Sequence, residues 1–484
     1  MGIPVYLAIF LLFVVVAGCS GAETSGSGIS QAEETETPTS QPNIVFVLTD
    51  DLDYASTQKM PQINSLLAKE GASFEEAFVS FPVCCPSRAT ILTGLYTHTN
   101  GVKGNNAPQG GFEKFVSEGH EENSIAVSMQ EAGYQTAFFG KYLNGYPAGE
   151  PTHVPPGWDE WYGKLDGQRL YDYRINENGE EVSYGSEEKD FFTDVLSNQA
   201  TDFVSRAAPE EEPFFAYVAP TAPHGPATPA ERHKGEFAGE EGLRPPSFDE
   251  EDVSDKPSWV RDMNRISGKQ SSNTDARHRK RLNSMLAVDE MVASLIQELE
   301  DAGELDNTFV VFTSDNGFEQ GEHRIKGGKR TPYEESARVP LFVRGPGIAA
   351  GSKIERLALN TDFAPTFAGL AGIEFPADGR SLAPLLHGED PAWRTSVLLE
   401  AFTNEEAQGE QANLPNYRAV RTETHKYVEY ENGERELYDL QADPYELESL
   451  HESADPALLE DLKAKLEALK SCSEEGCREA EDAS

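Results

Sequence analysis

The chain of 484 residues is poor in cysteine and in basic side chains. It has only five cysteines, and its 40 Lys and Arg residues are outnumbered by 83 Asp and Glu residues, which gives a formal charge of −43. A surface this negative argues against nucleic acid or an anionic membrane as a partner, because both carry negative charge. An anionic substrate would need local Lys and Arg residues to overcome the general field.

The apolar run from Val5 to Ala17 is too short to span a membrane. Its length is typical of a signal peptide, although no Lys or Arg precedes it. The tetrapeptide that ends in Cys19 has the form of a bacterial lipoprotein cleavage site, with Cys19 as the lipidated residue. We therefore expect a signal peptide over 1–18 and a disordered Ser/Thr/Glu-rich tether over 19–41. The mature protein would be exported, and either secreted or held at the outer face of the cell membrane only through this lipid anchor.

Two further cysteines, Cys472 and Cys477, lie five residues apart near the C-terminal end. In an oxidising compartment a small-loop disulfide is the simplest expectation for them. A zinc half-site is the alternative, although no second pair of ligands or histidine cluster lies nearby in the sequence.

The rest of the chain alternates short apolar strands with amphipathic helical patterns, which is typical of an α/β fold with a large, mostly parallel sheet flanked by helices. Strands are expected at Asn43–Thr49, Thr136–Gly140, Phe214–Ala219, Thr308–Ser314 and Pro340–Gly345. Apolar residues at helical spacing from Leu282 to Leu299 predict a packed helix, and the charged, Pro-rich stretch 227–275 predicts a long surface loop.

The pattern changes after about residue 391. Alternating apolar residues indicate antiparallel strands, with a hairpin turn at Asn432-Gly433, and "PALLEDLKAKLEAL" predicts an amphipathic helix. We therefore expect a large domain over 42–390 and a smaller subdomain over 391–484, built from an antiparallel sheet and a helix.

Polar side chains follow four of the expected strands, at the strand ends where open α/β sheets bind their ligands. These residues are Asp50, Asp51, Lys141, His224, Asp315 and Asn316. The three aspartates and the asparagine offer hard oxygen ligands, which together favour Ca²⁺ or Mg²⁺ over zinc. Each group alone is explained by a helix cap or a turn, but their occurrence at matching strand ends predicts a metal site.

The remaining cysteines, Cys84 and Cys85, are adjacent and precede Pro86. Pro is favoured in a first helical turn, so Cys84 is expected near a helix N-terminus, where the backbone N–H groups favour an anion. Arg88 can reach back to the same place. A Cys-x5-Arg phosphatase loop would need Arg at position 90 or 91, where Thr and Ile stand, and adjacent cysteines fit no zinc spacing.

The stretch from Cys84 to Gly94, "CCPSRATILTG", resembles the type I sulfatase motif C-x-P-S-R-x-x-x-L-T-G, and Cys85 fills a variable position. Similar segments run through nearly the whole folded chain, among them "NIVFVLTDDLDY", "FTSDNG", "GGKRTPYEES" and "APH". The segments "GKYLNGY" and "VPPGWDEWYG" and the C-terminal cysteine pair resemble the N-acetylglucosamine-6-sulfatase branch. The resemblance implies an alkaline phosphatase-like fold, with 42–390 as the catalytic domain.

The resemblance also implies a cofactor and a set of site residues. A formylglycine-generating enzyme would oxidise Cys84 to Cα-formylglycine, and one Ca²⁺ ion (or Mg²⁺) would be bound. The implied metal ligands are Asp50, Asp51, Asp315, Asn316 and an oxygen of residue 84. The implied catalytic residues are Cys84, Arg88, Lys141, His224 and Lys329.

The implied reaction is hydrolysis of a sulfate ester of a sulfated sugar such as N-acetylglucosamine 6-sulfate. A hydroxyl of the hydrated formylglycine would attack sulfur, and His224 or Lys329 would protonate the leaving alcohol. Many arylsulfatases carry Gly-Lys-Trp-His, but Leu143 stands in place of that His. His98 is expected to cap or pack, and His323 is a further candidate to face substrate.

Three other functions remain open at this point. An arylsulfatase, or a phosphonate monoester or phosphodiester hydrolase of the same superfamily, would share this site. A non-catalytic lipoprotein that binds sulfated glycans would leave Cys84 unmodified.

Overall fold

The computed structural model describes residues 41–402 and 413–483, which belong to the unit Ser40–Ser484. The expected signal peptide, Cys19 and almost all of the expected tether lie outside these residues and stay predictions. Among the described helices, none combines the length and the apolar character that crossing a membrane requires.

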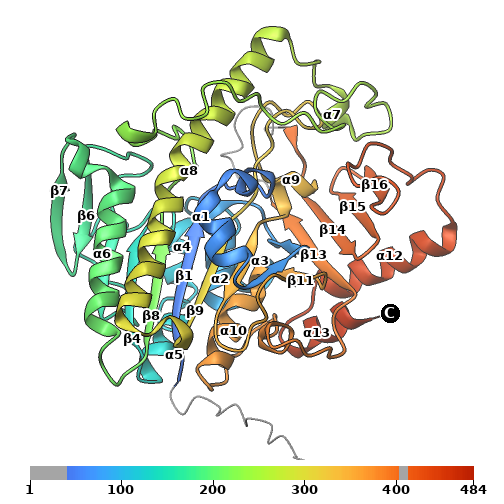
Figure 1. The fold of residues 1–484 in the computed structure, drawn as a ribbon. Coiled ribbons are helices and arrows are strands. Elements are labelled where there is room, and N and C mark those ends of the chain that lie inside the picture. Colours follow the sequence, from blue (N-terminus) through green and yellow to red (C-terminus); the bar gives the residue numbers. More distant parts are fainter. Residues whose placement is uncertain (1–40, 403–412, 484) are drawn as a thin grey trace, which may run out of the picture. The chain divides into compact units, whose positions relative to one another are not determined.

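A ten-stranded mixed sheet forms the centre of the larger part of the fold (Figure 1). Its five neighbouring central strands, β9 to β5 in the order below, run parallel to one another. From edge to edge the strands are β11 (Ser352–Ile354), β2 (Ala72–Phe74), β10 (Leu341–Arg344), β9 (Thr308–Ser314), β1 (Asn43–Thr49), β8 (Phe214–Ala219), β4 (Gln135–Gly140), β5 (Glu160–Lys164), β6 (Tyr173–Glu177) and β7 (Glu180–Tyr184).

The central strand β1 shows why this sequence forms a sheet that is covered on both faces. All seven of its residues are buried, as expected for a nearly continuous apolar run in a parallel sheet. Successive side chains point to opposite faces. Phe46 and Leu48 therefore join one hydrophobic core, and Val45 and Val47 join another.

Helices cover the two faces of the sheet. One core includes residues of α6 (Phe192–Ala207), α8 (Gly268–Ala302) and the short α1 (Pro61–Ile63). The other includes residues of α2 (Cys84–Thr93), α4 (Gly111–Ser117), α5 (Ile125–Glu131), α10 (Phe363–Leu370) and α11 (Ala383–Leu386). Further short elements are α3 (Thr97–Asn100), α7 (Ser258–Arg261), α9 (Glu334–Ala337) and the pair β3 (Ala77–Phe78) with β12 (Ala358–Leu359).

A second, antiparallel sheet follows in the C-terminal part of the chain. Its strands lie in chain order: β13 (Ser396–Ala401), β14 (Tyr417–Thr422), β15 (His425–Tyr430) and β16 (Arg435–Asp439). The helices α12 (Pro456–Leu469) and α13 (Glu475–Asp482) pack against it. This architecture confirms the expected α/β fold, with a large mixed sheet and a small antiparallel subdomain.

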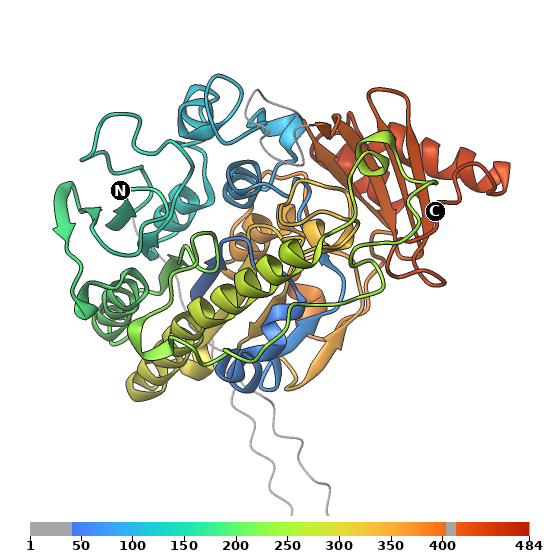
Figure 2. The ribbon, with the colours of Figure 1, turned by 90° about the horizontal axis from the view of Figure 1, so that it is seen from above.

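The stretch 227–275 differs from the expected surface loop. It contains α7 and the first turns of α8, and Lys256 and Val260 within it are buried. In Figure 2 the chain ahead of α8 runs toward the C-terminal sheet, where Lys256 Nζ donates a hydrogen bond to the hydroxyl oxygen of Tyr438 at 3.0 Å. Helix α8 begins earlier than its apolar pattern indicates because Ser267 and Gln270 form a capping box and the first turns are largely polar.

Candidate active site

The carboxyl ends of four parallel strands bring the predicted site residues to one edge of the sheet. Asp50 follows β1, Lys141 follows β4 and Asp315 follows β9, while His224 lies on the loop after β8. The register explains this convergence, because the last residue of β1, Thr49, pairs with the last residue of β9, Ser314.

Two backbone features place Lys141 and Asp51 at this edge. Gly140 has φ +109°, and a Cβ there would lie 2.1 Å from the carbonyl oxygen of Ala219, so only glycine fits. Asp51 has φ 66°, a left-handed conformation that is uncommon for a residue with a side chain. Such strain is often found at functional sites.

Cys84 is the first residue of α2, and every residue of this helix is buried. Its thiol donates a hydrogen bond to Asp50 Oδ1 at 3.3 Å and lies 3.9 Å from Asp51 Oδ1. The thiol therefore lies at the centre of the strand-end residues, as the helix-N-terminus interpretation requires.

Lys329 joins the predicted metal ligands to Cys84. Its Nζ lies 2.6 Å from Cys84 Sγ and 3.4 Å from Asn316 Oδ1, and it forms an ion pair with Asp51. One ammonium group thus contacts three of the five predicted metal ligands, which shows that these groups converge on a point suited to a cation.

The other two predicted cationic residues are held by carboxylates of the same cluster. Lys141 Nζ lies 2.6 Å from Asp50 Oδ2. Arg88 Nε donates to Asp315 Oδ2 at 2.7 Å and Nη1 donates to the carbonyl oxygen of Lys141 at 2.6 Å. Arg88 Nη2 is buried and has no hydrogen-bond partner among the described residues, so one donor of this guanidinium is free.

His224 lies at the open side of the cluster. Its Nε2 lies 3.7 Å from Asp51 Oδ2. The His224 side chain is 28% exposed to solvent, whereas the Asp51 side chain is only 4% exposed. Of the predicted catalytic residues it is therefore the one best placed to meet a group that arrives from solvent.

The electrostatics of the cluster depend on burial and on the charged groups within it. Burial alone would raise the pKa of Asp50, but Lys141, His224 and Arg88 hold that pKa well below its usual range. The pKa of Asp315 is raised instead, by burial and by the neighbouring Asp50. Carboxylates pull the pKa of Lys329 well above the ordinary lysine value despite burial, so its ammonium stays charged.

The same environment makes Cys84 a poor thiolate. Burial and then Asp50 raise the pKa of its thiol far above the ordinary value, and the two lysines offset only part of this. Because the thiolate is the nucleophilic form of cysteine, unmodified Cys84 is unsuited to nucleophilic attack.

Two site residues were not identified from the sequence. Gln168, on the loop after β5, donates from Nε2 to Asp50 Oδ2 at 3.4 Å, and its buried Oε1 has no partner among the described residues. Arg281 on α8 pairs with Asp53 at 3.0 Å and also donates to the backbone oxygen of Asp51. Of these two residues, only Arg281 had a feature that the sequence could have revealed: it is a basic residue directly before the apolar stripe of its helix.

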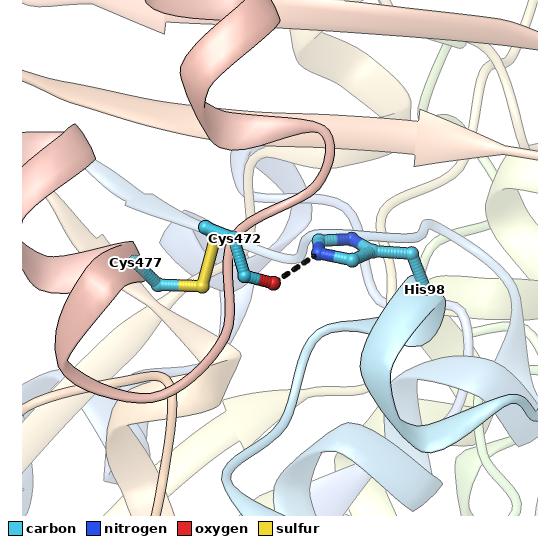
Figure 3. Close-up of side chains that lie close together, drawn as sticks. All are labelled: His98, Cys472 and Cys477. Carbon is cyan, nitrogen blue, oxygen red and sulfur yellow. Dashed lines mark hydrogen bonds between the residues drawn. A yellow bond between two sulfur atoms is a disulfide. The ribbon is translucent and has the colours of Figure 1, made fainter.

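The histidines outside the cluster contact other parts of the protein. His98 Nδ1 donates to Glu400 Oε1 at 3.1 Å, and its Nε2 lies 3.1 Å from the carbonyl oxygen of Cys472 (Figure 3). His323 is buried and stacks on Tyr333, so it is not exposed to substrate in this structure. Cys472 and Cys477 form the expected disulfide. Neither sulfur is therefore available as a thiolate ligand, which argues against a zinc half-site at this pair.

Leu143 occupies the place where many arylsulfatases carry a histidine. Its side chain is buried in the apolar core beside Tyr142, so it offers no group that could transfer a proton.

Comparison with known proteins agrees with this fold and site. The sulfatase family model matches residues 42–373, and a model described as "N-sulphoglucosamine sulphohydrolase, C-terminal" matches residues 321–472. A human protein named N-acetylglucosamine-6-sulfatase is 34% identical over 513 residues, covering 97% of this chain and 90% of its own length. A Caenorhabditis elegans protein named putative extracellular sulfatase Sulf-1 homolog is 38% identical, covering 75% of this chain and 52% of its own length, so this chain spans about half of that relative.

A solved structure described as a complex with its substrate D-glucosamine-2-N,6-O-disulfate superposes with a TM-score of 0.76 and 28% identity, covering 91% of this chain and 99% of the other. The large mixed sheet and its strand-end cluster define a hydrolase of the alkaline phosphatase-like fold. Within that class, the chain belongs to the sulfatase family of sulfuric ester hydrolases, which confirms the family predicted from the motif.

Proposed function

We propose that this protein hydrolyses sulfate monoesters of sulfated sugars, with 6-sulfated glucosamine derivatives as the substrate class. The observation that carries the proposal is the position of Cys84: a buried residue of the sulfatase motif at a helix N-terminus, enclosed by Asp50, Asp51 and Lys329. The sugar class rests on the human relative named N-acetylglucosamine-6-sulfatase and on the neighbour described with a glucosamine disulfate.

The cluster fits a divalent cation of the hard, oxygen-binding type. Asp50, Asp51 and Asp315 are buried carboxylates, and Asn316 adds an amide oxygen. These residues, together with the oxygen of residue 84 after its conversion to formylglycine, would hold one Ca²⁺ ion. Bound there, the ion and the hydrated formylglycine would supply a nucleophilic oxygen at neutral pH and neutralise negative charge on the sulfate.

The protein's own cations extend this neutralisation. Lys329 contacts residue 84 directly, and Lys141 pairs with Asp50, which also contacts residue 84. Both lysines keep their charge, because neighbouring carboxylates raise the pKa of each. Such fixed charges stabilise a sulfuryl group as charge shifts toward its oxygens. The free Nη2 of Arg88 is available to orient the group at residue 84.

Protonation of the leaving alcohol is assigned to His224, with Lys329 as the alternative donor. His224 is the partly exposed member of the cluster, and Leu143 offers no histidine for the task. A positioned general acid contributes on the order of 10²–10⁴-fold in rate.

Export and lipid anchoring form part of the proposal. The N-terminal sequence through Cys19 has the form of a lipoprotein signal, and a relative carries the name extracellular sulfatase. The predicted domain limits at 41/42 and 390/391 likewise stay a proposal.

The decisive experiment uses the protein co-expressed with a formylglycine-generating enzyme. Its turnover is compared on N-acetylglucosamine 6-sulfate, glucosamine N-sulfate, an aryl sulfate and a phosphonate monoester. We expect the highest kcat/KM on the 6-sulfated sugar. Preference for the aryl sulfate or the phosphonate ester would reject the sugar assignment and favour the corresponding alternative.

A further inference from the structure

A second group of metal-binding side chains lies away from the strand-end cluster. His323, Glu335 and Glu446 each place one ligand atom within 4.8 Å of the others'. They come from the loop after β9, from α9 and from the segment between β16 and α12, so they join the large domain to the C-terminal subdomain.

The key feature of this group is a buried imidazole nitrogen without a partner. His323 is fully buried, and its Nε2 has no hydrogen-bond partner among the described residues. The nearest carboxylate oxygen is Glu335 Oε2, at 3.8 Å, and this atom is also without a hydrogen bond. A distance of 3.8 Å is too long for a hydrogen bond, so a shared proton does not satisfy these two atoms.

The other ring nitrogen of His323 is held in the way that metal-binding histidines usually are. Nδ1 lies 2.9 Å from Glu250 Oε2 and can donate to it. In the tautomer in which Nδ1 donates to Glu250, Nε2 carries the lone pair that binds a metal ion. The ring also stacks on Tyr333, with the centroids 3.9 Å apart, which fixes its orientation.

Both carboxylates and lysines surround this group, and Lys256 and Lys426 are the lysines that act on His323. Lys426 pairs with Glu446 and Glu334, and Lys256 approaches Glu250 at 3.6 Å. Glu335 has no lysine or arginine partner among the described residues, and a ligand atom of Glu446 lies within 4.8 Å of one of its own. A divalent cation bound between Glu335 and Glu446 would offset the repulsion between these two carboxylates.

From these observations we propose that His323, Glu335 and Glu446 bind a divalent transition-metal ion of the Zn²⁺ type, which ties the C-terminal subdomain to the large domain. One imidazole and two carboxylates are typical Zn²⁺ ligands, and ligands of a zinc ion at about 2.0–2.2 Å lie roughly 3–4 Å from one another. The side chain of Glu335 keeps 22% of its exposure, which gives the ion a path from solvent. The proposal does not depend on the reaction proposed above.

Zn²⁺ binding to the full-length protein tests this proposal. The protein is stripped with chelator and saturated with Ca²⁺, so that the oxygen-ligand cluster is occupied, and then titrated with Zn²⁺ by calorimetry and by metal analysis after dialysis. We expect one Zn²⁺ per chain with micromolar or tighter affinity. We also expect one Zn²⁺ per chain in D51N, because this substitution impairs the strand-end cluster and leaves His323, Glu335 and Glu446 unchanged.

Two variants and a matched control locate the ion. H323Q should weaken Zn²⁺ binding at least tenfold, and E250Q, which removes the support of the imidazole, should weaken it by about 10–100-fold. The control is H98Q, because His98 lies in another group of potential ligands, beside Cys472 and Cys477, whose sulfurs are bonded to each other. Its Zn²⁺ affinity should equal that of the wild type.

Three results would overturn the proposal. One is a wild-type protein that retains no Zn²⁺ under these conditions. Another is Zn²⁺ binding that disappears in folded D51N, because the ion would then lie in the strand-end cluster. The third is Zn²⁺ binding unchanged in H323Q. Should H323Q fail to fold, E335Q replaces it, because Glu335 is partly exposed; in E335Q the Zn²⁺-dependent rise in Tm should be lost.

Discussion

The ammonium of Lys329 lies 2.6 Å from the sulfur of Cys84. A lysine this close would ordinarily favour a thiolate, yet burial and Asp50 keep the pKa of the Cys84 thiol raised. The site is thus built around a charged lysine and a neutral thiol. This arrangement suits a residue 84 that acts in a modified form, with Lys329 neutralising the negative charge of a substrate.

Replacing Cys84 with alanine should abolish sulfate ester hydrolysis, because alanine cannot be oxidised to formylglycine and offers no nucleophilic oxygen. The matched control is C85A, which changes the adjacent buried cysteine. Cys85 packs in the apolar core, so C85A should keep most of the activity. Initial rates on N-acetylglucosamine 6-sulfate, with intact-peptide mass spectrometry of residue 84, provide the measurement. Equal activity in C84A and C85A would reject Cys84 as the reactive residue.

Chelator treatment should lower kcat by at least about a hundredfold, because the buried carboxylates of Asp50, Asp51 and Asp315 would lose the cation proposed to offset them. Adding Ca²⁺ alone to the stripped protein should restore the rate. If activity recovers with Ca²⁺ in the absence of Zn²⁺, the loss of activity came from the strand-end cluster and not from the proposed Zn²⁺ site at His323. A fully stripped protein with undiminished activity would contradict the metal assignment.

Gln168→Ala should lower kcat by about tenfold, or about 1.4 kcal/mol, and leave KM nearly unchanged. Gln168 donates to the Asp50 oxygen that also pairs with Lys141, so it positions that carboxylate. The matched control is Q199A, because Gln199 bonds to Glu177 and Tyr184 at the edge of the sheet. A rise in KM at constant kcat in Q168A would instead indicate direct contact with substrate.

The sequence predicted the central strands best, because these are continuous apolar runs buried on both faces. The limits of β1, β8 and β9 agree with the expected strands to the residue. The polar residues after these strands could be foreseen as neighbours because parallel strands end at one edge. Family and fold are confirmed, while the role of each site residue stays a prediction.

Other contacts could not be predicted because they join residues that are far apart in the chain. Arg281 and Asp53 are separated by 228 positions, and Gln168 and Asp50 by 118. No local pattern marks such pairs. The His323 group was missed for the same reason, since Glu446 approaches it only through the packing of the C-terminal subdomain.

Lys164 should make the stability of the fold depend on pH in a direction unusual for a lysine. It lies at the end of β5, is buried, and donates to the carbonyl oxygen of Arg169 at 2.6 Å. Burial lowers the pKa of Lys164 to about 7, although the rings of Tyr173 and Phe192 face its Nζ at 4.1 and 4.2 Å and favour the charged form. In the unfolded chain this lysine keeps a pKa of about 10.4.

Between about pH 7 and 10 the unfolded state therefore binds one proton more at Lys164 than the folded state does. The contribution of Lys164 to stability is least favourable below pH 7 and improves as pH rises through this window. K164M removes the cost of burying the charge, so its Tm at pH 6 should exceed that of the wild type, and the difference should shrink toward pH 10. The control is K463M on α12, where the lysine is exposed and no pH-dependent difference is expected. A Tm of K164M below that of the wild type at pH 6 would show that the two aromatic rings outweigh desolvation and that Lys164 is stably charged in the fold.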